Sequence, residues 1–126
     1  MTRSERHRKP MAVQGVGLTQ AQFHILLTLA EGERHGYGIM QEILRRTEGA
    51  VVLGPGTLYR SIKQLLDRRL IVEVESASGD RRDVGKQRRS YSLTPEGIIR
   101  TTEEAQRLRS LVKWAEDLLV LEGGQP

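Results

Sequence analysis

The chain has no cysteine, which excludes a disulfide framework and a zinc site built from thiolates. Histidine is also scarce, and none of the three residues His7, His24 and His35 has the spacing to a second ligand that predicts a metal site. The sequence lacks a phosphate-cradling glycine loop and a nucleophile elbow. These absences argue against an enzyme, and we expect no cofactor and no bound metal.

Long apolar runs and aromatic side chains are rare as well. No apolar segment is long enough to span a bilayer or to form the core of a signal peptide, so we expect a cytoplasmic protein that has no membrane partner. Aromatic residues make up 4% of the 126 residues, which leaves a thin core for one domain of ordinary size. Part of the apolar surface is therefore expected to be buried between subunits.

The charges are unevenly distributed along the chain. Residues 1–93 hold 16 Lys and Arg against 10 Asp and Glu, whereas residues 94–126 hold 4 against 6. The basic part is suited to a polyanion, and the acidic part is suited to another task. Residues 1–17 contain four early basic residues and are expected to be a flexible tail, with a basic arm that contacts phosphates as the alternative.

Residues 54–69 have the pattern of an amphipathic helix. Pro55 suits the first helical turn, and one apolar stripe follows at Leu58, Ile62, Leu65 and Leu66. Tyr59 lies on the flank of that stripe. The opposite face carries side chains that can hydrogen-bond to base edges, namely Thr57, Arg60, Lys63 and Gln64. A solvated polar face is common in ordinary amphipathic helices, so the choice between the two interpretations depends on the neighbouring segments.

Two further helices are expected before this segment. Thr19 and Gln22 match a capping box, and the apolar face that follows consists of Phe23, Ile25, Leu26, Leu27, Leu29 and Ala30. The next helix opens at His35 and has a stripe formed by Ile39, Met40, Ile43 and Leu44. Gly36 and Gly38 are poor helix formers, which suggests close approach to another backbone or to a phosphate. His35 and Tyr37 are candidates for phosphate contacts, and His35 is equally explained as a polar helix start.

A β-hairpin is expected after the basic helix. Residues 70–75 and 88–93 have β-branched residues and alternation typical of strands, and the turn-rich segment 76–87 joins them. Residues 50–53 are too short for a helix and are expected to be a small strand. The hairpin has a basic tip consisting of Arg81, Arg82, Lys86, Arg88 and Arg89.

The last segment is a long helix that begins with Thr94 as its N-cap and Pro95 at N1. Two apolar seams run along it. The first has coiled-coil spacing and consists of Ala105, Leu108, Val112, Ala115 and Leu119. The second consists of Leu111, Trp114, Leu118 and Leu121. One domain core can cover only one seam, so two seams predict a partner chain and a homodimer.

Together these segments predict a mainly α (α+β) fold, a winged helix-turn-helix with a long C-terminal dimerisation helix. We expect a DNA-binding domain over residues 18–93 and the dimerisation helix over residues 94–122. The basic helix would read base edges in the major groove of double-stranded DNA, and the wing would lie on the backbone or in the minor groove. A homodimer implies a palindromic operator with half-sites about one helical turn apart.

Three motifs resemble those of the PadR family of bacterial transcriptional regulators. They are residues 35–39 (HGYGI), residues 55–59 (PGTLY) and residues 89–97 (RSYSLTPEG), and they occur in the family's order and spacing. The resemblance covers about residues 18–120 and implies a homodimeric winged-helix repressor, similar to the short subfamily with one helix after the wing. It also implies that some members respond to a small aromatic or lipophilic molecule. Gly54 stands where the family often has serine, so a side-chain cap is absent.

Trp114 has two interpretations. The simpler one is that it fills the dimer interface, where aromatic residues dominate the energetics. The alternative is that Trp114 and its symmetry mate stack an aromatic effector in a flat pocket, next to the small residues Ala105 and Ala115. For the whole protein, the alternative to a DNA-binding regulator is a winged-helix module that binds another protein without sequence-specific DNA binding.

Overall fold

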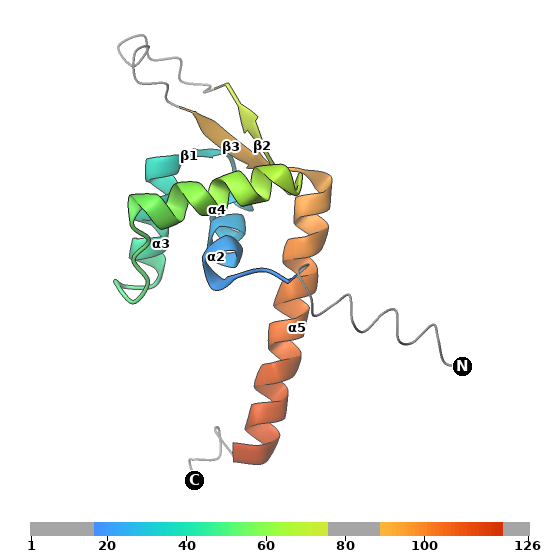
Figure 1. Ribbon diagram of the computed structural model, residues 1–126. Coiled ribbons are helices and arrows are strands. Elements are labelled where there is room, and N and C mark those ends of the chain that lie inside the picture. Colours follow the sequence, from blue (N-terminus) through green and yellow to red (C-terminus); the bar gives the residue numbers. More distant parts are fainter. Residues whose placement is uncertain (1–16, 76–88, 120–126) are drawn as a thin grey trace, which may run out of the picture.

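The computed structural model describes residues 17–75 and 89–119. Within these ranges, four helices pack around a core and a small sheet lies at one end (Figure 1). The predicted N-terminal arm, most of the wing tip and the end of the last helix lie outside the described residues. Predictions for Arg81, Arg82, Lys86 and Arg88 concern that part of the chain.

Helix α2 (Gln20–Leu29) occupies the middle of the domain. The predicted capping box is confirmed: the Gln22 backbone N–H donates to Thr19 Oγ1 at 3.0 Å, and the Thr19 N–H donates to Gln22 Oε1 at 3.0 Å. Only part of the predicted apolar face enters the core. Ile25, Leu26 and Leu29 are buried, whereas Leu27, on a second apolar face of the helix, is 44% exposed within one chain.

Helix α3 (Gly36–Arg46) follows a two-residue strand, β1 (Arg34–His35). The core side of α3 consists of Ile39 and Ile43, while Leu44 at the edge of the stripe remains 44% exposed. The small strand predicted at residues 50–53 is wrong, because this segment is a connection that has no neighbouring strand within the described residues. Thr47 Oγ1 accepts the Val51 N–H there at 3.0 Å and satisfies it without a sheet.

Helix α4 (Pro55–Asp67) confirms the predicted amphipathic helix, with Pro55 at its first position. Leu58, Ile62 and Leu65 are at most 2% exposed and form the centre of the core. Arg69 lies just past the end of the helix and adopts a positive φ of 60°, while the Leu70 N–H donates to the Leu65 carbonyl at 3.0 Å. This is a Schellman-type end, in which the left-handed residue is an arginine instead of the usual glycine.

The predicted hairpin is confirmed by strands β2 (Ile71–Val74) and β3 (Ser90–Leu93), which pair antiparallel with Ile71 opposite Leu93. The sheet order is β1-β3-β2, so the first strand in sequence lies at the edge beside β3, with His35 opposite Ser90. Tyr91 on the central strand is 4% exposed and joins the core. The hairpin extends beyond the helical part of the domain (Figure 1).

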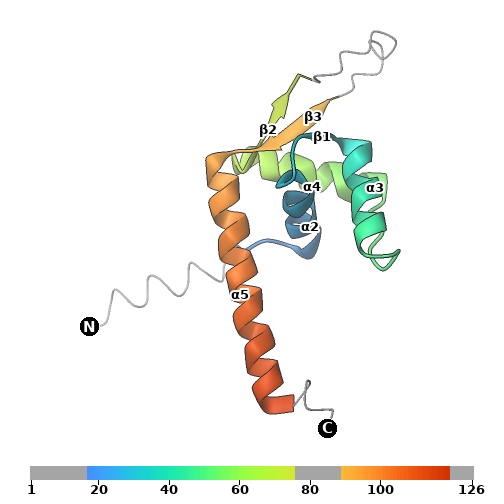
Figure 2. The same ribbon diagram turned by 180° about the vertical axis from the view of Figure 1, so that it is seen from behind.

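Helix α5 (Pro95–Leu119) begins at a corner built by Thr94. Its hydroxyl donates to the Arg69 carbonyl at 2.8 Å and accepts the Gly97 N–H at 2.9 Å, which confirms Thr94 as the N-cap. Buried residues occur only in the first part of α5, at Gly97, Thr101 and Glu104. The remainder of the helix projects away from the domain, as both views show (Figures 1 and 2).

Candidate nucleic-acid interface

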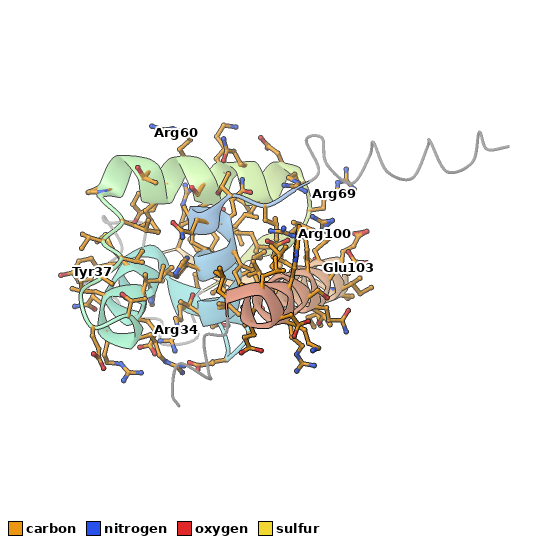
Figure 3. All side chains as sticks on the ribbon, turned by 90° about the horizontal axis from the view of Figure 1, so that it is seen from below. Arg34, Tyr37, Arg60, Arg69, Arg100 and Glu103 are labelled. Carbon is orange, nitrogen blue, oxygen red and sulfur yellow. The ribbon has the colours of Figure 1, made fainter. Side chains whose placement is uncertain are left out.

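One side of α4 forms the candidate recognition face. All four side chains that the sequence singles out there, Thr57, Arg60, Lys63 and Gln64, are exposed. Figure 3 shows Arg60 directed away from α2, α3 and α5. The face is not purely basic, because Lys63 Nζ lies 3.6 Å from Asp67 Oδ2 one turn further along. The arrangement is a polar helix face of the width and chemistry that fit a DNA major groove.

Tyr59 lies on the flank of this face and is half exposed. A Cβ atom at Gly36 would come within 2.6 Å of Tyr59 Oη, so glycine at position 36 makes room for the tyrosine ring. The close approach expected of Gly36 therefore exists, but its neighbour is a side chain and not a backbone or a phosphate. Gly38 has no such neighbour, since a Cβ there would meet nothing within 4 Å.

His35 and Tyr37 flank the start of α3. His35 is the N-cap residue, but its side chain makes no capping hydrogen bond to α3. Tyr37 is 62% exposed and points outward from the end of the domain formed by α3 (Figure 3). Both positions leave the side chains beside the start of a helix, where backbone N–H groups favour an anion such as a phosphate.

Arg89 is the residue of the predicted basic tip that the structure describes. Its Nε lies 3.3 Å from Glu73 Oε2 on the neighbouring strand, and its side chain is 54% exposed. Burial raises the pKa of the adjacent Tyr91 hydroxyl above its ordinary value of 10.0, and the negative charge of Glu73 acts in the same direction. Arg89 is thus held at the base of the wing with part of its guanidinium accessible.

Comparisons with known proteins agree with this geometry. The sequence profile of the family described as "Transcriptional regulator PadR-like family" matches residues 25–103. The chain belongs to this family. It is 34% identical over 92 residues to the transcriptional regulator Rv3488 of Mycobacterium tuberculosis, which covers 73% of this chain and 78% of the relative.

Solved structures of PadR-type regulators share the fold. A PadR family transcription regulator from hypervirulent Clostridium difficile R20291 matches with a TM-score of 0.66 and 26% identity, over 80% of this chain and 99% of that one. A transcriptional regulator from Clostridium thermocellum matches with a TM-score of 0.66 and 25% identity, over 77% and 87% of the two chains. These matches confirm the predicted winged helix-turn-helix, and the protein is a DNA-binding transcriptional regulator of a family whose members are not enzymes.

Residues 17–75 and 89–119 include no group of three or more His, Cys, Asp or Glu side chains that could hold a metal ion. The helices in the same ranges are all too short or too polar to cross a membrane.

Sequence reasoning missed a contact behind the recognition face. Gln22 Nε2 on α2 donates to Gln64 Oε1 on α4 at 2.9 Å, although the sequence pattern predicts only a capping role for Gln22. A signal was available, because Gln22 precedes Ile25, Leu26 and Leu29 by three, four and seven residues. A polar amide at that spacing lies on the apolar side of the helix and needs a buried partner.

A basic cluster at the end of α4 was also missed. It consists of Arg68, Arg69 and Arg100, and Figure 3 shows Arg69 and Arg100 near that end of the helix. Arg68 donates from Nη1 to the Gly17 carbonyl at 3.1 Å. Partial burial, and secondarily the positive charge of Arg100, lower the pKa of Arg68 below its ordinary value. No pattern in the sequence indicates that residues 68 and 100 are neighbours, because the chain forms the sheet between them before α5 begins.

The predicted dimer residues lie on the part of α5 that leaves the domain. Leu111, Val112, Trp114, Leu118 and Leu119 are between 40% and 65% exposed. Leu108 and Ala115 are half-buried, and Ala105 is exposed. Within one chain, both seams of this PadR-like regulator therefore present apolar surface to solvent.

Proposed function

We propose that this PadR-like regulator is a homodimeric repressor that places α4 in the major groove of a palindromic operator. The observation that carries the proposal is the division of α4 into an apolar side that packs on the core and an exposed side formed by Thr57, Arg60, Lys63 and Gln64. Repression needs no further contact, since a protein bound over a promoter excludes the polymerase. We expect it to act in the cytoplasm, where it meets DNA.

The contacts divide into two groups. Thr57, Arg60, Lys63 and Gln64 face the groove and are the candidates for base contacts, with Arg60 suited to a bidentate contact with guanine. Tyr59, His35 and Tyr37 flank the start of α3 and the side of α4, and we assign them to phosphates, which set the position without reading sequence. Arg89 would contact the backbone beside the groove, together with Arg81, Arg82, Lys86 and Arg88 of the wing.

The dimer is proposed from the exposed apolar surface of α5. Val112, Trp114 and Leu118 are more than half exposed on a helix that has no neighbour beyond its first turns within the described residues. Isolated apolar side chains on a surface are ordinary, but a contiguous stripe of this length indicates a protein partner. A second copy of α5 has the complementary stripe, because a two-fold interface uses the same surface on both chains.

An effector site at Trp114 is the finer part of the proposal. Trp114 is 61% exposed and is the single tryptophan of the chain, so its fluorescence reports on this site alone. If the pair of Trp114 rings holds a planar aromatic molecule, quinoline as a test ligand quenches this emission and weakens operator binding. If Trp114 only fills the interface, quinoline changes neither, and replacement of Trp114 weakens the dimer instead.

The experiment that tests the proposed function is binding of the full chain to DNA upstream of its own gene, followed by fluorescence anisotropy. A shuffled fragment of the same length is the control, and both are titrated at several salt concentrations. We expect the upstream DNA to bind at least ~10³-fold more tightly than the shuffled DNA, with affinity that falls steeply as salt increases. No binding at low salt would overturn the proposal and favour the protein-binding module.

A further inference from the structure

We propose that Gln22 fixes the orientation of the Gln64 amide, so that the recognition helix presents a hydrogen-bond donor at this position. Gln22 would be a positioning residue: it touches no DNA and acts through Gln64. The proposal rests on the proposed function, in which α4 lies in the major groove. It adds a prediction of which bases Gln64 selects.

Two hydrogen bonds in series lead from the start of α2 to the exposed face of α4, and a third holds the Gln22 backbone. The Thr19 backbone N–H donates to Gln22 Oε1 at 3.0 Å. Gln22 Nε2 then donates to Gln64 Oε1 at 2.9 Å. A third bond, from the Gln22 N–H to Thr19 Oγ1, fixes the Gln22 backbone at 3.0 Å.

The direction of this series follows from its first member. A backbone N–H can only donate, so the Gln22 side-chain atom that faces Thr19 must be the oxygen. The other end of the Gln22 amide is then the NH₂ group, which can only donate, so the Gln64 atom that faces it must also be an oxygen. Consequently the Gln64 NH₂ group is the end directed away from Gln22.

Burial makes the constraint effective. Gln22 is 4% exposed and lies on the same side of α2 as Ile25 and Leu26, so water has little access to compete for its amide. A hydrogen bond in such surroundings is stronger than one in water, and an unpaired amide there is costly. Gln64 itself is exposed, and the bond to Gln22 holds a side chain that would otherwise be mobile before DNA is bound.

The fixed orientation changes what Gln64 can read. A free glutamine pairs with adenine by using both its oxygen and its NH₂ group. Here the oxygen is turned towards Gln22 Nε2, so the end of the amide that faces outward is the NH₂ donor. A donor matches the acceptors on the major-groove edge of guanine, which offers two, and of thymine, which offers one, but it does not match the amino group of cytosine. We therefore expect one position of each half-site to favour guanine or thymine over cytosine.

The variant Gln22→Glu reverses the constraint while keeping the helix start. Glutamate is the usual partner in a capping box, so it still accepts the Thr19 N–H. A carboxylate cannot donate, so the Gln64 amide must turn its NH₂ group inward and present its oxygen to the DNA. The preferred base at the contacted position should then change to one that carries an amino group, cytosine or adenine.

The measurement is the dissociation constant of wild-type and Gln22→Glu protein for operators in which each position carries each of the four bases, at one salt concentration. At one position per half-site, we expect the wild type to bind the operator with guanine or thymine about tenfold more tightly than the operator with cytosine. The Gln22→Glu variant should show the opposite preference, also about tenfold, and the other positions should be unchanged. Gln20→Glu is the matched control, because Gln20 is exposed, lies two residues away and gains the same charge. It should weaken binding to all operators alike.

Two further measurements keep the inference falsifiable. Gln22→Met removes the amide at nearly constant volume, and it should flatten the preference at the same position without reversing it.

In the free protein, the ¹⁵N resonance of the Gln64 side-chain amide should shift in Gln22→Glu and show slower hydrogen exchange than in the wild type, since the NH₂ group becomes bonded. An unchanged amide spectrum, or a base profile in Gln22→Glu that matches Gln20→Glu, would overturn the inference. If wild-type protein does not distinguish operator from shuffled DNA, the proposed function fails, whereas the amide spectrum still decides the role of Gln22.

Discussion

Helices α4 and α5 are both amphipathic, and the fold uses their two sides in opposite ways. In α4, the apolar residues Leu58, Ile62 and Leu65 are buried and the polar side is exposed. In most of α5, the apolar residues are the exposed ones, with Trp114 at 61% and Leu118 at 65%. Only the first turns of α5, around Gly97 and Thr101, belong to the domain core.

The difference indicates which kind of partner each helix meets. An exposed polar and basic side on a completed domain suits a hydrated polyanion, because burial of its side chains requires a partner with many hydrogen-bonding groups. An exposed apolar stripe suits a protein surface, because each Å² of apolar area that is buried on association contributes about 25 cal/mol of favourable free energy.

The first prediction concerns the anchored part of α5. A Cβ atom at Gly97 would lie 2.0 Å from the Leu70 carbonyl oxygen, so Gly97→Ala must displace backbone. We expect a loss of about 3 kcal/mol or more in the free energy of unfolding, measured by urea denaturation. Gly38→Ala is the control, since a Cβ there meets nothing within 4 Å and alanine favours the helix. Equal stability of the two variants would show that the first turns of α5 are not anchored.

The second prediction concerns the projecting part of α5. Leu118→Glu places an unpaired charge in the proposed interface of each subunit, and we expect it to weaken the dimer by about 3 kcal/mol. Sedimentation equilibrium measures the loss, and far-UV circular dichroism should show an intact fold. Gln106→Glu adds the same charge to an exposed position outside both seams and should leave the dimer unchanged. A dimer in Leu118→Glu as tight as in the wild type would place the interface elsewhere.

The third prediction concerns the exposed side of α4. Arg60→Ala should reduce the affinity for the operator by about 1–3 kcal/mol and relax the preference at one base position, measured by anisotropy. Arg109→Ala removes the same charge from an exposed position on α5 and should have a small effect that is equal for all DNA sequences. Similar losses in both variants would mean that charge alone, and not the face of α4, determines binding.

The fourth prediction concerns pH and the boundary between the two parts of α5. The hydrogen bond from Arg107 lowers the pKa of Glu104 below its ordinary value of 4.5, against the opposing effect of burial. A lowered carboxylate pKa stabilises the fold above about pH 4.5, and this stabilisation is lost as the pH falls through the lowered pKa. Because Arg107 is 58% exposed, we expect less than about 1 kcal/mol.

The measurement compares the urea stability of Glu104→Gln and wild type at pH 7 and at pH 3. The variant should be less stable at pH 7, and the gap should narrow as the pH falls below 4.5. Glu103→Gln alters the exposed neighbouring carboxylate and serves as the control. A gap of the same size at pH 7 and at pH 3 would assign the role of Glu104 to packing instead of charge.

Local chemistry made much of this fold predictable. Three features each depend on residues no more than four positions apart, so the local sequence is enough to predict them. They are the capping box at Thr19, the proline at the start of α4 and the N-cap at Thr94. The buried stripe of α4 follows from its 3.6-residue period. The exposed side of α4 follows from the same period, which is why all four predicted side chains share one face.

Contacts between distant segments were beyond such reasoning. The short strand is at Arg34–His35 because β3 passes beside it, and nothing local marks those two residues as a strand. Gly36 is required by the ring of Tyr59, and Gly97 by the carbonyl of Leu70. The bond from Gln22 to Gln64 joins residues 42 positions apart, and only the packing of α2 against α4 brings them together.

The corner at Thr94 has a mechanical consequence. The Thr94 hydroxyl bonds both to the Arg69 carbonyl, just past the end of α4, and to the Gly97 N–H in the first turn of α5. The two helices are therefore held together at this corner. With 25 residues, α5 is about 37 Å long. In the proposed dimer, a rotation of α5 by about 5° around its C-terminal end would move the corner at Thr94 by about 3 Å. This displacement is close to the ~3.4 Å step between adjacent base pairs, so a small change in the angle at which two α5 helices cross would move the two recognition helices relative to each other by a comparable distance.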